Sequence, residues 1–315
     1  MPVPGGEGAT PLVEARGLTK RFGTFTAVDA VDFEVAKGEA FGFLGPNGAG
    51  KSSTMRMIAA VSPSSGGTLR VLGMDPAADG PAIRARLGVV PQEDNLDLEL
   101  TVYENLLIYG RYFGMSRAAI KERAAELLDF VQLTERRNDQ VDPLSGGLKR
   151  RLTIARSRVS GPDLLLLDEP TTGLDPQARH VLWDRLYRLK QSGVTLVLTT
   201  HYMDEAEQLC DRLVVMDKAR IVAEGSPRQL IAEHSSREVV ELRFEVDAQD
   251  AALPALEGIA ERIEPLPDRV LLYVDDGDKA AAVVHDRGLV PESVVVRRST
   301  LEDVFLRLTG RTLVD

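Results

Sequence analysis

The segment Gly45-Pro46-Asn47-Gly48-Ala49-Gly50-Lys51-Ser52 decides how this chain folds. It matches the pattern G-x-x-x-x-G-K-[ST] at every fixed position, which is the pattern of the phosphate-binding P-loop. The apolar residues 40–44 before it predict a buried strand, and residues 52–60 after it predict a helix. We expect its three glycines to adopt positive φ angles, so that backbone N–H groups point into one concavity at the start of that helix. A phosphate bound there would meet the ammonium group of Lys51, while the hydroxyl of Ser52 would face Mg²⁺.

Two acidic residues follow a second apolar run. Residues 164–167 are all leucine, which is typical of a central strand in a parallel sheet, and Asp168 and Glu169 come directly after them. Ligands bind at this end of the strands in open α/β sheets. Beside a P-loop, this position predicts that Asp168 holds Mg²⁺ and that Glu169 is the general base acting on an attacking water. The structural alternative is an acidic pair that only caps the strand before Pro170.

Two predicted helices begin with recognisable caps. The stretch Leu144-Ser-Gly-Gly147 places Ser145 at an N-cap with glycines in the first turn, and such an end offers free N–H groups to a phosphate. The same Ser-Gly-Gly sequence is also common in loops. Asp175, followed by Pro176, is the predicted N-cap of the second helix.

The remaining pattern of the first 230 residues predicts an α/β domain with a mixed sheet. Short apolar runs over residues 12–44 predict antiparallel strands that lead into the strand before the P-loop. Residues 66–72 predict a small hairpin. The region of residues 93–160 is predicted to be helical, with Thr101 and Glu104 forming a capping box. Further buried strands are predicted at residues 87–90 and 195–198, and a hairpin at residues 213–224.

A domain boundary is predicted near residues 225–237. Beyond it, apolar patterns predict a strand at residues 239–246, a helix, a strand, a strand at 270–274, a helix at 279–287, a strand at 293–296 and a helix at 301–308. The first six elements have the order of a ferredoxin-like βαββαβ unit. We therefore expect a flexible N-terminus over residues 1–11, a first domain over residues 12–230 and a small α+β domain over residues 238–310.

Composition narrows the possible functions. The chain has 315 residues, of which 43% are hydrophobic, and a net charge of −10. The basic surplus of a nucleic-acid-binding protein is missing, so no nucleic-acid partner is expected. No apolar run approaches the roughly 18 residues of a membrane span. Cys210 is the single cysteine, which excludes an intrachain disulfide; its apolar neighbours favour a packed thiol over a reactive one.

The motifs occur in an order that resembles a known family. The P-loop is followed by Gln92, by Leu-Ser-Gly-Gly ending at Gly147, by residues 164–169, by Gly173-Leu-Asp175 and by His201 after a buried strand. Over residues 12–230 the chain resembles the nucleotide-binding subunits of ATP-binding cassette (ABC) transporters. The resemblance implies an ATPase that binds ATP and Mg²⁺ and works as a head-to-tail homodimer, in which each ATP lies between the P-loop of one copy and the Ser-Gly-Gly of the other.

The resemblance also implies individual roles. Catalysis is assigned to Glu169, His201 and Gln92, and the metal to Ser52, Gln92 and Asp168. ATP contacts are assigned to Phe22, Gly45, Pro46, Asn47, Gly48, Ala49, Gly50, Lys51, Ser52, Ser53, Ser145, Gly146, Gly147 and Asp175. Phe22 would stack on adenine, with a packed core aromatic as the alternative. His201 would contact the γ-phosphate, with a simple strand-end histidine as the alternative. Leu148 departs from the family pattern, which usually has glutamine there.

A narrower resemblance concerns three other stretches. Residues 91–97, 110–114 and 299–310 are similar to the ATPases of bacterial daunorubicin-type drug exporters and of nodulation lipo-oligosaccharide exporters. Both branches stay open at this point. They imply a separate integral membrane permease as partner, a position at the cytoplasmic face of the membrane, and export of a small amphipathic compound. The rival class is a soluble ABC ATPase without a transport role.

Overall fold

The structure is a computed structural model that describes residues 10–245 and 248–310. It divides into two compact units, Met1–Glu224 and Gly225–Asp315. The sequence-based prediction ended the first domain at residue 230, whereas helix α8 (Pro227–His234) belongs to the second unit. Most of the predicted flexible N-terminus lies outside the described residues.

A six-stranded sheet forms the centre of the first unit. Its strand order is β5-β6-β7-β3-β8-β9, and the pairs from β5 to β8 are parallel. The strands are β3 (Ala40–Leu44), β5 (Leu87–Val90), β6 (Leu164–Asp168), β7 (Thr195–Thr200), β8 (Arg212–Asp217) and β9 (Arg220–Gly225). The four leucines of β6 are buried between two parallel neighbours, which confirms the predicted central strand.

A second, antiparallel sheet has the strand order β2-β1-β4. It consists of β1 (Val13–Phe22), β2 (Phe25–Val35) and β4 (Gly66–Val71). The hairpin predicted at residues 66–72 is wrong, because this segment is one strand that pairs with β1, with Val71 opposite Val13. Phe33 of β2 packs edge-on against Phe43 of β3, with ring centroids 5.0 Å apart, so aromatic side chains join the two sheets.

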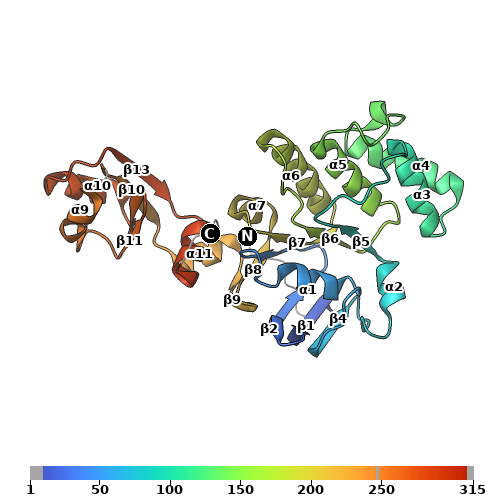
Figure 1. Cartoon of the computed structure of the whole chain (residues 1–315), viewed down its shortest axis with the longest axis horizontal. Coiled ribbons are helices and arrows are strands. Elements are labelled where there is room, and N and C mark those ends of the chain that lie inside the picture. Colours follow the sequence, from blue (N-terminus) through green and yellow to red (C-terminus); the bar gives the residue numbers. More distant parts are fainter. Residues whose placement is uncertain (1–9, 246–247, 311–315) are drawn as a thin grey trace. The chain divides into compact units, whose positions relative to one another are not determined.

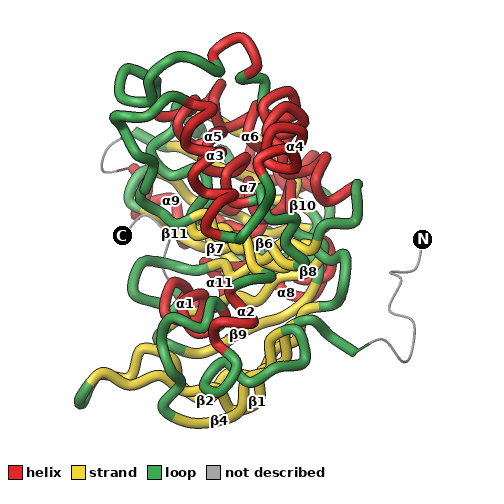
Figure 2. Tube along the Cα trace, turned by 90° about the vertical axis from the view of Figure 1, so that its right-hand side faces the viewer, coloured by secondary structure: helices red, strands yellow, loops and turns green. Residues whose placement is uncertain are grey.

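Helices cover the other face of the six-stranded sheet. Figures 1 and 2 both show the layer of α3, α4, α5 and α6 on one side of the sheet and β1, β2 and β4 on the other. The helices of the first unit are α1 (Lys51–Ile58), α2 (Gly80–Arg84), α3 (Val102–Tyr112), α4 (Arg117–Phe130), a 3₁₀ turn (Thr134–Arg136), α5 (Gly146–Ser157), α6 (Pro176–Gln191) and α7 (Met203–Leu209). The capping box predicted for Thr101 and Glu104 is confirmed at the start of α3.

The second unit has the predicted βαββαβ order, followed by a final helix. Its elements after α8 are β10 (Glu238–Arg243), α9 (Ala248–Leu256), β11 (Arg262–Leu266), β12 (Arg269–Val274), α10 (Gly277–Asp286), β13 (Ser293–Arg298) and α11 (Leu301–Thr309). The four strands form an antiparallel sheet in the order β11-β12-β10-β13. Across residues 10–245 and 248–310, no helix combines the length and apolar character needed to span a bilayer.

Candidate active site

The P-loop connects the end of β3 to the start of α1. Gly48 and Gly50 have φ angles of 81° and 104°, as predicted. Gly45 does not have a positive φ, so that expectation is wrong for this residue. Close packing requires a glycine at position 45 instead, because a Cβ atom there would lie 2.3 Å from the carbonyl oxygen of Met216. The loop is therefore shaped by two left-handed glycines and by one close approach to the end of β8.

Lys51 is held inside the loop. Its side chain is only 4% exposed, and Nζ donates to the carbonyl oxygens of Gly45 (2.7 Å) and Pro46 (3.0 Å). Nζ also lies 3.6 Å from Oε1 of Glu169. Burial lowers the pKa of Lys51, while the carboxylates of Glu169 and Asp168 act in the opposite direction. The ammonium group is thus positioned between the loop and the end of β6.

The two predicted acidic residues have different surroundings. Oδ1 of Asp168 accepts hydrogen bonds from the hydroxyl groups of Ser52 (3.1 Å) and Thr199 (2.5 Å). Glu169 has a φ angle of 45°, which is unusual for a residue other than glycine. Its N–H donates to the carbonyl oxygen and to the hydroxyl oxygen of Thr199 on the neighbouring strand β7 (3.1 and 3.0 Å). Thr199 therefore holds the carboxylate of Asp168 and the backbone of Glu169 in place relative to the sheet.

Three residues lie close to the carboxylate of Glu169. Its Oε2 accepts from Nε2 of Gln92 (3.3 Å) and from the hydroxyl of Thr172 (3.1 Å). Nδ1 of His201 lies 3.3 Å from the same oxygen, without the geometry of a hydrogen bond. The structure thus brings together Gln92, Glu169 and His201, which come from three separate segments of the chain. A water next to Oε2 would have a carboxylate to accept its proton.

A pocket of about 190 Å³ opens in front of this cluster. It is lined by Phe25, Ala27, Asn47, Gly48, Gly50, Lys51, Ser52, Ser53, Gln92 and Glu169. Phe25 was missed by the sequence reasoning, whereas Phe22 does not line the pocket. Phe22 is 54% exposed, so the core alternative is wrong for it, and it lies opposite Phe25 where β1 and β2 meet. The ring of Phe25 is therefore the one placed for stacking at the pocket, while Nζ of Lys20 lies 4.8 Å from the centroid of the Phe22 ring.

Four predicted ligand residues lie elsewhere. Ser145 is the N-cap of α5, as predicted, and its hydroxyl makes no capping hydrogen bond. At Gly147 a Cβ atom would lie 2.9 Å from Cβ of Ala178 on α6, so the two helices pack closely there; Gly146 has more room. Asp175 caps α6 by accepting from the N–H of Ala178, which confirms that prediction. None of these four residues lines the pocket in front of Lys51.

The donor atoms beside the P-loop suit a magnesium ion. The hydroxyl of Ser52, the carboxylate of Asp168 and the side chain of Gln92 provide the hard oxygen ligands that Mg²⁺ prefers. Among residues 10–245 and 248–310, no group of three or more His, Cys, Asp or Glu residues could hold a metal by itself. The residues therefore fit a magnesium ion that is also held by phosphate oxygens. When bound, such an ion would neutralise negative charge on the phosphates.

Arg150 of α5 is a site residue that the sequence reasoning missed. Its guanidinium is buried, donates to several backbone carbonyl groups, and has Nη1 3.7 Å from Oδ1 of Asp94. The backbone acceptors are the carbonyl oxygens of Pro170 (2.7 Å), Asp168 (3.1 Å), Glu169 (3.1 Å), Gln92 (3.4 Å) and Pro91. One side chain therefore ties the segment of Gln92 to the segment of Glu169. No motif indicates this role, because carbonyl acceptors have no sequence signature.

Glu205 of α7 is a second buried group near the site. It is fully buried and accepts a hydrogen bond from the indole of Trp183 (3.2 Å). Burial raises the pKa of Glu205, while the hydroxyl groups of Thr200 and Thr171 and the indole act in the opposite direction.

We expect Glu205→Gln to raise the melting temperature more at pH 8 than at pH 5. A raised pKa means that the folded state holds the Glu205 proton more tightly than the unfolded chain. That stabilisation is present below the unfolded pKa and is lost as the pH rises through the folded pKa. Glutamine stays neutral and keeps an oxygen for Trp183. Scanning calorimetry at both pH values tests this, with the exposed Glu257→Gln as the control; an equal shift at both pH values would contradict it.

Sequence comparisons identify the family. The profile described as "ABC transporter" matches residues 28–172, and the profile described as "Nodulation factor export protein NodI, C-terminal domain" matches residues 247–310. The chain is 45% identical to a Nod factor export ATP-binding protein I of Ralstonia nicotianae, over 98% of this chain and 97% of that protein. This chain belongs to the ATP-binding subunits of ABC transporters. ABC ATP-binding subunits are ATPases that power transport, so this ABC subunit is an ATPase.

Solved structures confirm the predicted ABC fold. An ATP-binding subunit of an ABC transporter superimposes with a TM-score of 0.64 at 31% identity, over 70% of this ABC subunit and 92% of that chain. A dimeric ATP-binding cassette in a post-hydrolysis state, bound to ADP and phosphate, has a TM-score of 0.62 at 26% identity, over 68% of this chain and 98% of its own. The predicted resemblance to nodulation exporter ATPases is confirmed by the Ralstonia relative.

Proposed function

We propose that this ABC subunit hydrolyses ATP within a head-to-tail pair of identical copies and thereby drives export through a separate permease. The observation that carries the proposal is the cluster of Lys51, Ser52, Asp168, Glu169 and Gln92 at one end of the parallel strands, with His201 beside it. The cluster supplies a phosphate ligand, metal ligands and a general base. Ser145–Gly147 lies outside this pocket, which supports its use by a second copy.

The pair gives ATP a way to do mechanical work. A γ-phosphate that touches Lys51 of one copy and Ser145 of the other binds the closed pair better than the open one. That difference in affinity is what shifts a conformational equilibrium. Hydrolysis with Glu169 as base removes the bridge and lets the pair reopen. The similar cassette of known structure is a dimer with bound ADP and phosphate, which supports pairing of two copies.

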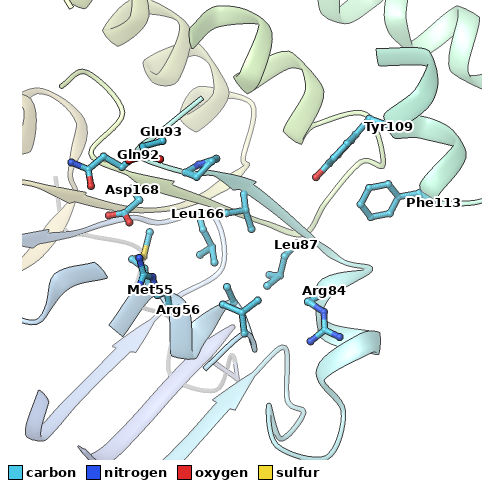
Figure 3. Close-up of a pocket in the computed structure, with 14 residues that line it drawn as sticks. Met55, Arg56, Arg84, Leu87, Gln92, Glu93, Tyr109, Phe113, Leu166 and Asp168 are labelled. Carbon is cyan, nitrogen blue, oxygen red and sulfur yellow. The ribbon is translucent and has the colours of Figure 1, made fainter. Parts of the chain in front are cut away.

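A cavity of about 600 Å³ is the proposed docking site of the permease. Figure 3 shows Gln92 and Asp168 at one end of it and the rings of Tyr109 and Phe113 of α3 at the other. Apolar side chains such as Val61 and Val89 line it, together with Arg56 and Arg84. Gln92 lines both this cavity and the pocket in front of Lys51. A permease segment seated here would therefore touch the residue that donates to the general base.

The exported compound is proposed from the relatives. The Ralstonia relative is named for Nod factor export. We extend this to a small amphipathic or lipid-like compound for the present subunit. The proposed location is the cytoplasmic face of the membrane, where such a permease exposes its docking segments.

A pull-down with Glu169→Gln as bait tests the transport role. The bait is incubated with ATP and detergent-solubilised membranes, and mass spectrometry identifies what it retains. We expect an integral membrane protein, retained about tenfold less by bait that also carries Val61→Glu, because a buried unpaired carboxylate costs more than 1 kcal/mol. The matched control is Val222→Glu, a valine of β9 that is exposed but lies outside the cavity. Retention of soluble partners only would favour the non-transport class.

A further inference from the structure

Strand β13 has an unpaired edge with an apolar surface. It is the last strand of the sheet in the second unit, and β10 is its one neighbour among the described strands. Val294, Val295 and Val296 are 44%, 46% and 39% exposed. Three consecutive half-exposed valines at a sheet edge are unusual, because such edges pair readily with other strands and are normally protected by charge or proline.

The backbone alternation shows which groups face the open side. The N–H of Ser299 donates to the carbonyl oxygen of Arg237 on the β10 side (3.3 Å). In an antiparallel pair, successive residues direct their backbone groups alternately toward and away from the neighbour. Val295 and Arg297 therefore face β10, and the N–H and C=O groups of Val294 and Val296 face outward. At the start of the strand Glu292 turns inward, donating to Arg243 O (2.7 Å), so the open edge begins at Val294.

We propose that this edge pairs with β13 of a second copy of the chain, antiparallel and about a two-fold axis at Val295. This axis sets Val294 opposite Val296 of the second copy. The outward N–H and C=O groups of these two residues then form two backbone hydrogen bonds with each other, and the symmetry repeats the pair once. The axis also brings Glu292, which directly precedes the strand, near Arg298 at the end of the second copy's strand. Both of these side chains are exposed, and neither has an ion-pair partner among the described residues.

The charges select this register and this occupant. An axis moved by one residue, to Val294 or Val296, would leave Glu292 opposite an uncharged residue. Arg297 does not compete, because it is bound to Glu241 (2.6 Å) and Asp303 (2.7 Å) within its own copy. A strand that carries an acidic residue before its three valines and a basic residue after them is complementary to itself when reversed. The best-matched partner is thus the same strand, which makes the contact isologous.

The inference goes beyond the proposed function, since this contact needs no nucleotide. A pair joined at β13 stays associated when the ATP-binding faces separate, and the second copy remains at high local concentration for the next closure. Failure of the ATPase assignment would leave the β13 contact intact, and failure of the contact would leave the ATPase intact.

Disulfide trapping in the full chain without ATP tests the register. Val295→Cys places a thiol on the proposed axis, where directly opposed residues outside the hydrogen-bonded pairs have Cα atoms about 4.5 Å apart, within disulfide range. The native Cys210 is 6% exposed and burial raises its thiol pKa, so the new thiol is the reactive one. With diamide as oxidant we expect a covalent dimer from Val295→Cys and none from the control Val290→Cys, which is 87% exposed. Equal trapping of both variants, or of neither, would overturn the proposal.

Charge exchange gives a second, independent measurement. Glu292→Arg or Arg298→Glu is expected to weaken nucleotide-free dimerisation by roughly 2- to 30-fold in sedimentation velocity, because two cross-strand pairs become repulsive. The double variant Glu292→Arg/Arg298→Glu restores both pairs and is expected to regain wild-type dimerisation. A double variant that dimerises no better than the single ones would overturn the register.

Discussion

Glu169→Gln is expected to lower kcat for ATP hydrolysis roughly 10²- to 10⁴-fold, the usual contribution of a general base. The carboxylate lies 3.3 Å from Nε2 of Gln92 and 3.1 Å from the hydroxyl of Thr172, and β7 fixes its backbone. Glutamine has the same shape and keeps an oxygen for Thr172, but it cannot accept a proton from water. ATP binding should therefore persist, because the phosphate ligands of the P-loop are unchanged.

Steady-state turnover and equilibrium binding of a fluorescent ATP analogue separate these two effects. The matched control is Glu257→Gln in the second unit, which is exposed and distant in sequence from the site motifs. It should leave both quantities at the wild-type value. Normal turnover in Glu169→Gln would remove this residue from the mechanism and would move the search for the base to another group near Gln92.

Lys51→Ala is expected to weaken ATP binding itself, by roughly 10- to 160-fold. This range corresponds to the loss of one hydrogen bond to a charged group, at about 1.5–3 kcal/mol. A second effect also lowers the ATP affinity of this variant. Without the ammonium group, the carboxylates of Glu169 and Asp168 would repel the phosphates at close range. Oε1 of Glu169 lies 3.6 Å from Nζ, and the Glu169 side chain is only 6% exposed.

Isothermal titration calorimetry of Lys51→Ala measures this loss. Lys121→Ala on the exposed face of α4 is the control, and near-UV circular dichroism verifies that both variants are folded. The ratio of the two affinities isolates the contribution of the loop lysine from the effect of removing any positive charge. An ATP affinity equal to that of the control would contradict the phosphate-binding role of the loop.

Features encoded by neighbouring residues could be predicted from the sequence. Strand β3 matches its predicted bounds, because an apolar run followed by a glycine-rich turn is a local signal. Asp175 and the box of Thr101 and Glu104 cap their helices as predicted for the same reason. The β4 segment was assigned incorrectly, because its partner β1 is distant in the sequence and pairing between distant strands leaves no local pattern.

The site shows the same limit. Motif order was enough to name Gln92, Asp168, Glu169 and His201, which the structure brings together. Phe25 was missed because its place at the pocket depends on where the β1–β2 hairpin turns. Gly45 was correctly named but for the wrong reason, since the close carbonyl of Met216 belongs to a strand far along the chain.

Arg150 connects α5 to the end of β6 through hydrogen bonds to the backbone. A planar guanidinium holds its donors in a fixed fork, so it transmits displacement with little give. It grips the carbonyl groups of Gln92, Asp168 and Glu169 from a helix whose first turn is Gly146 and Gly147. A tilt of that helix must carry the Glu169 backbone with it. The position of the first turn of α5 and the position of Glu169 are therefore coupled through Arg150.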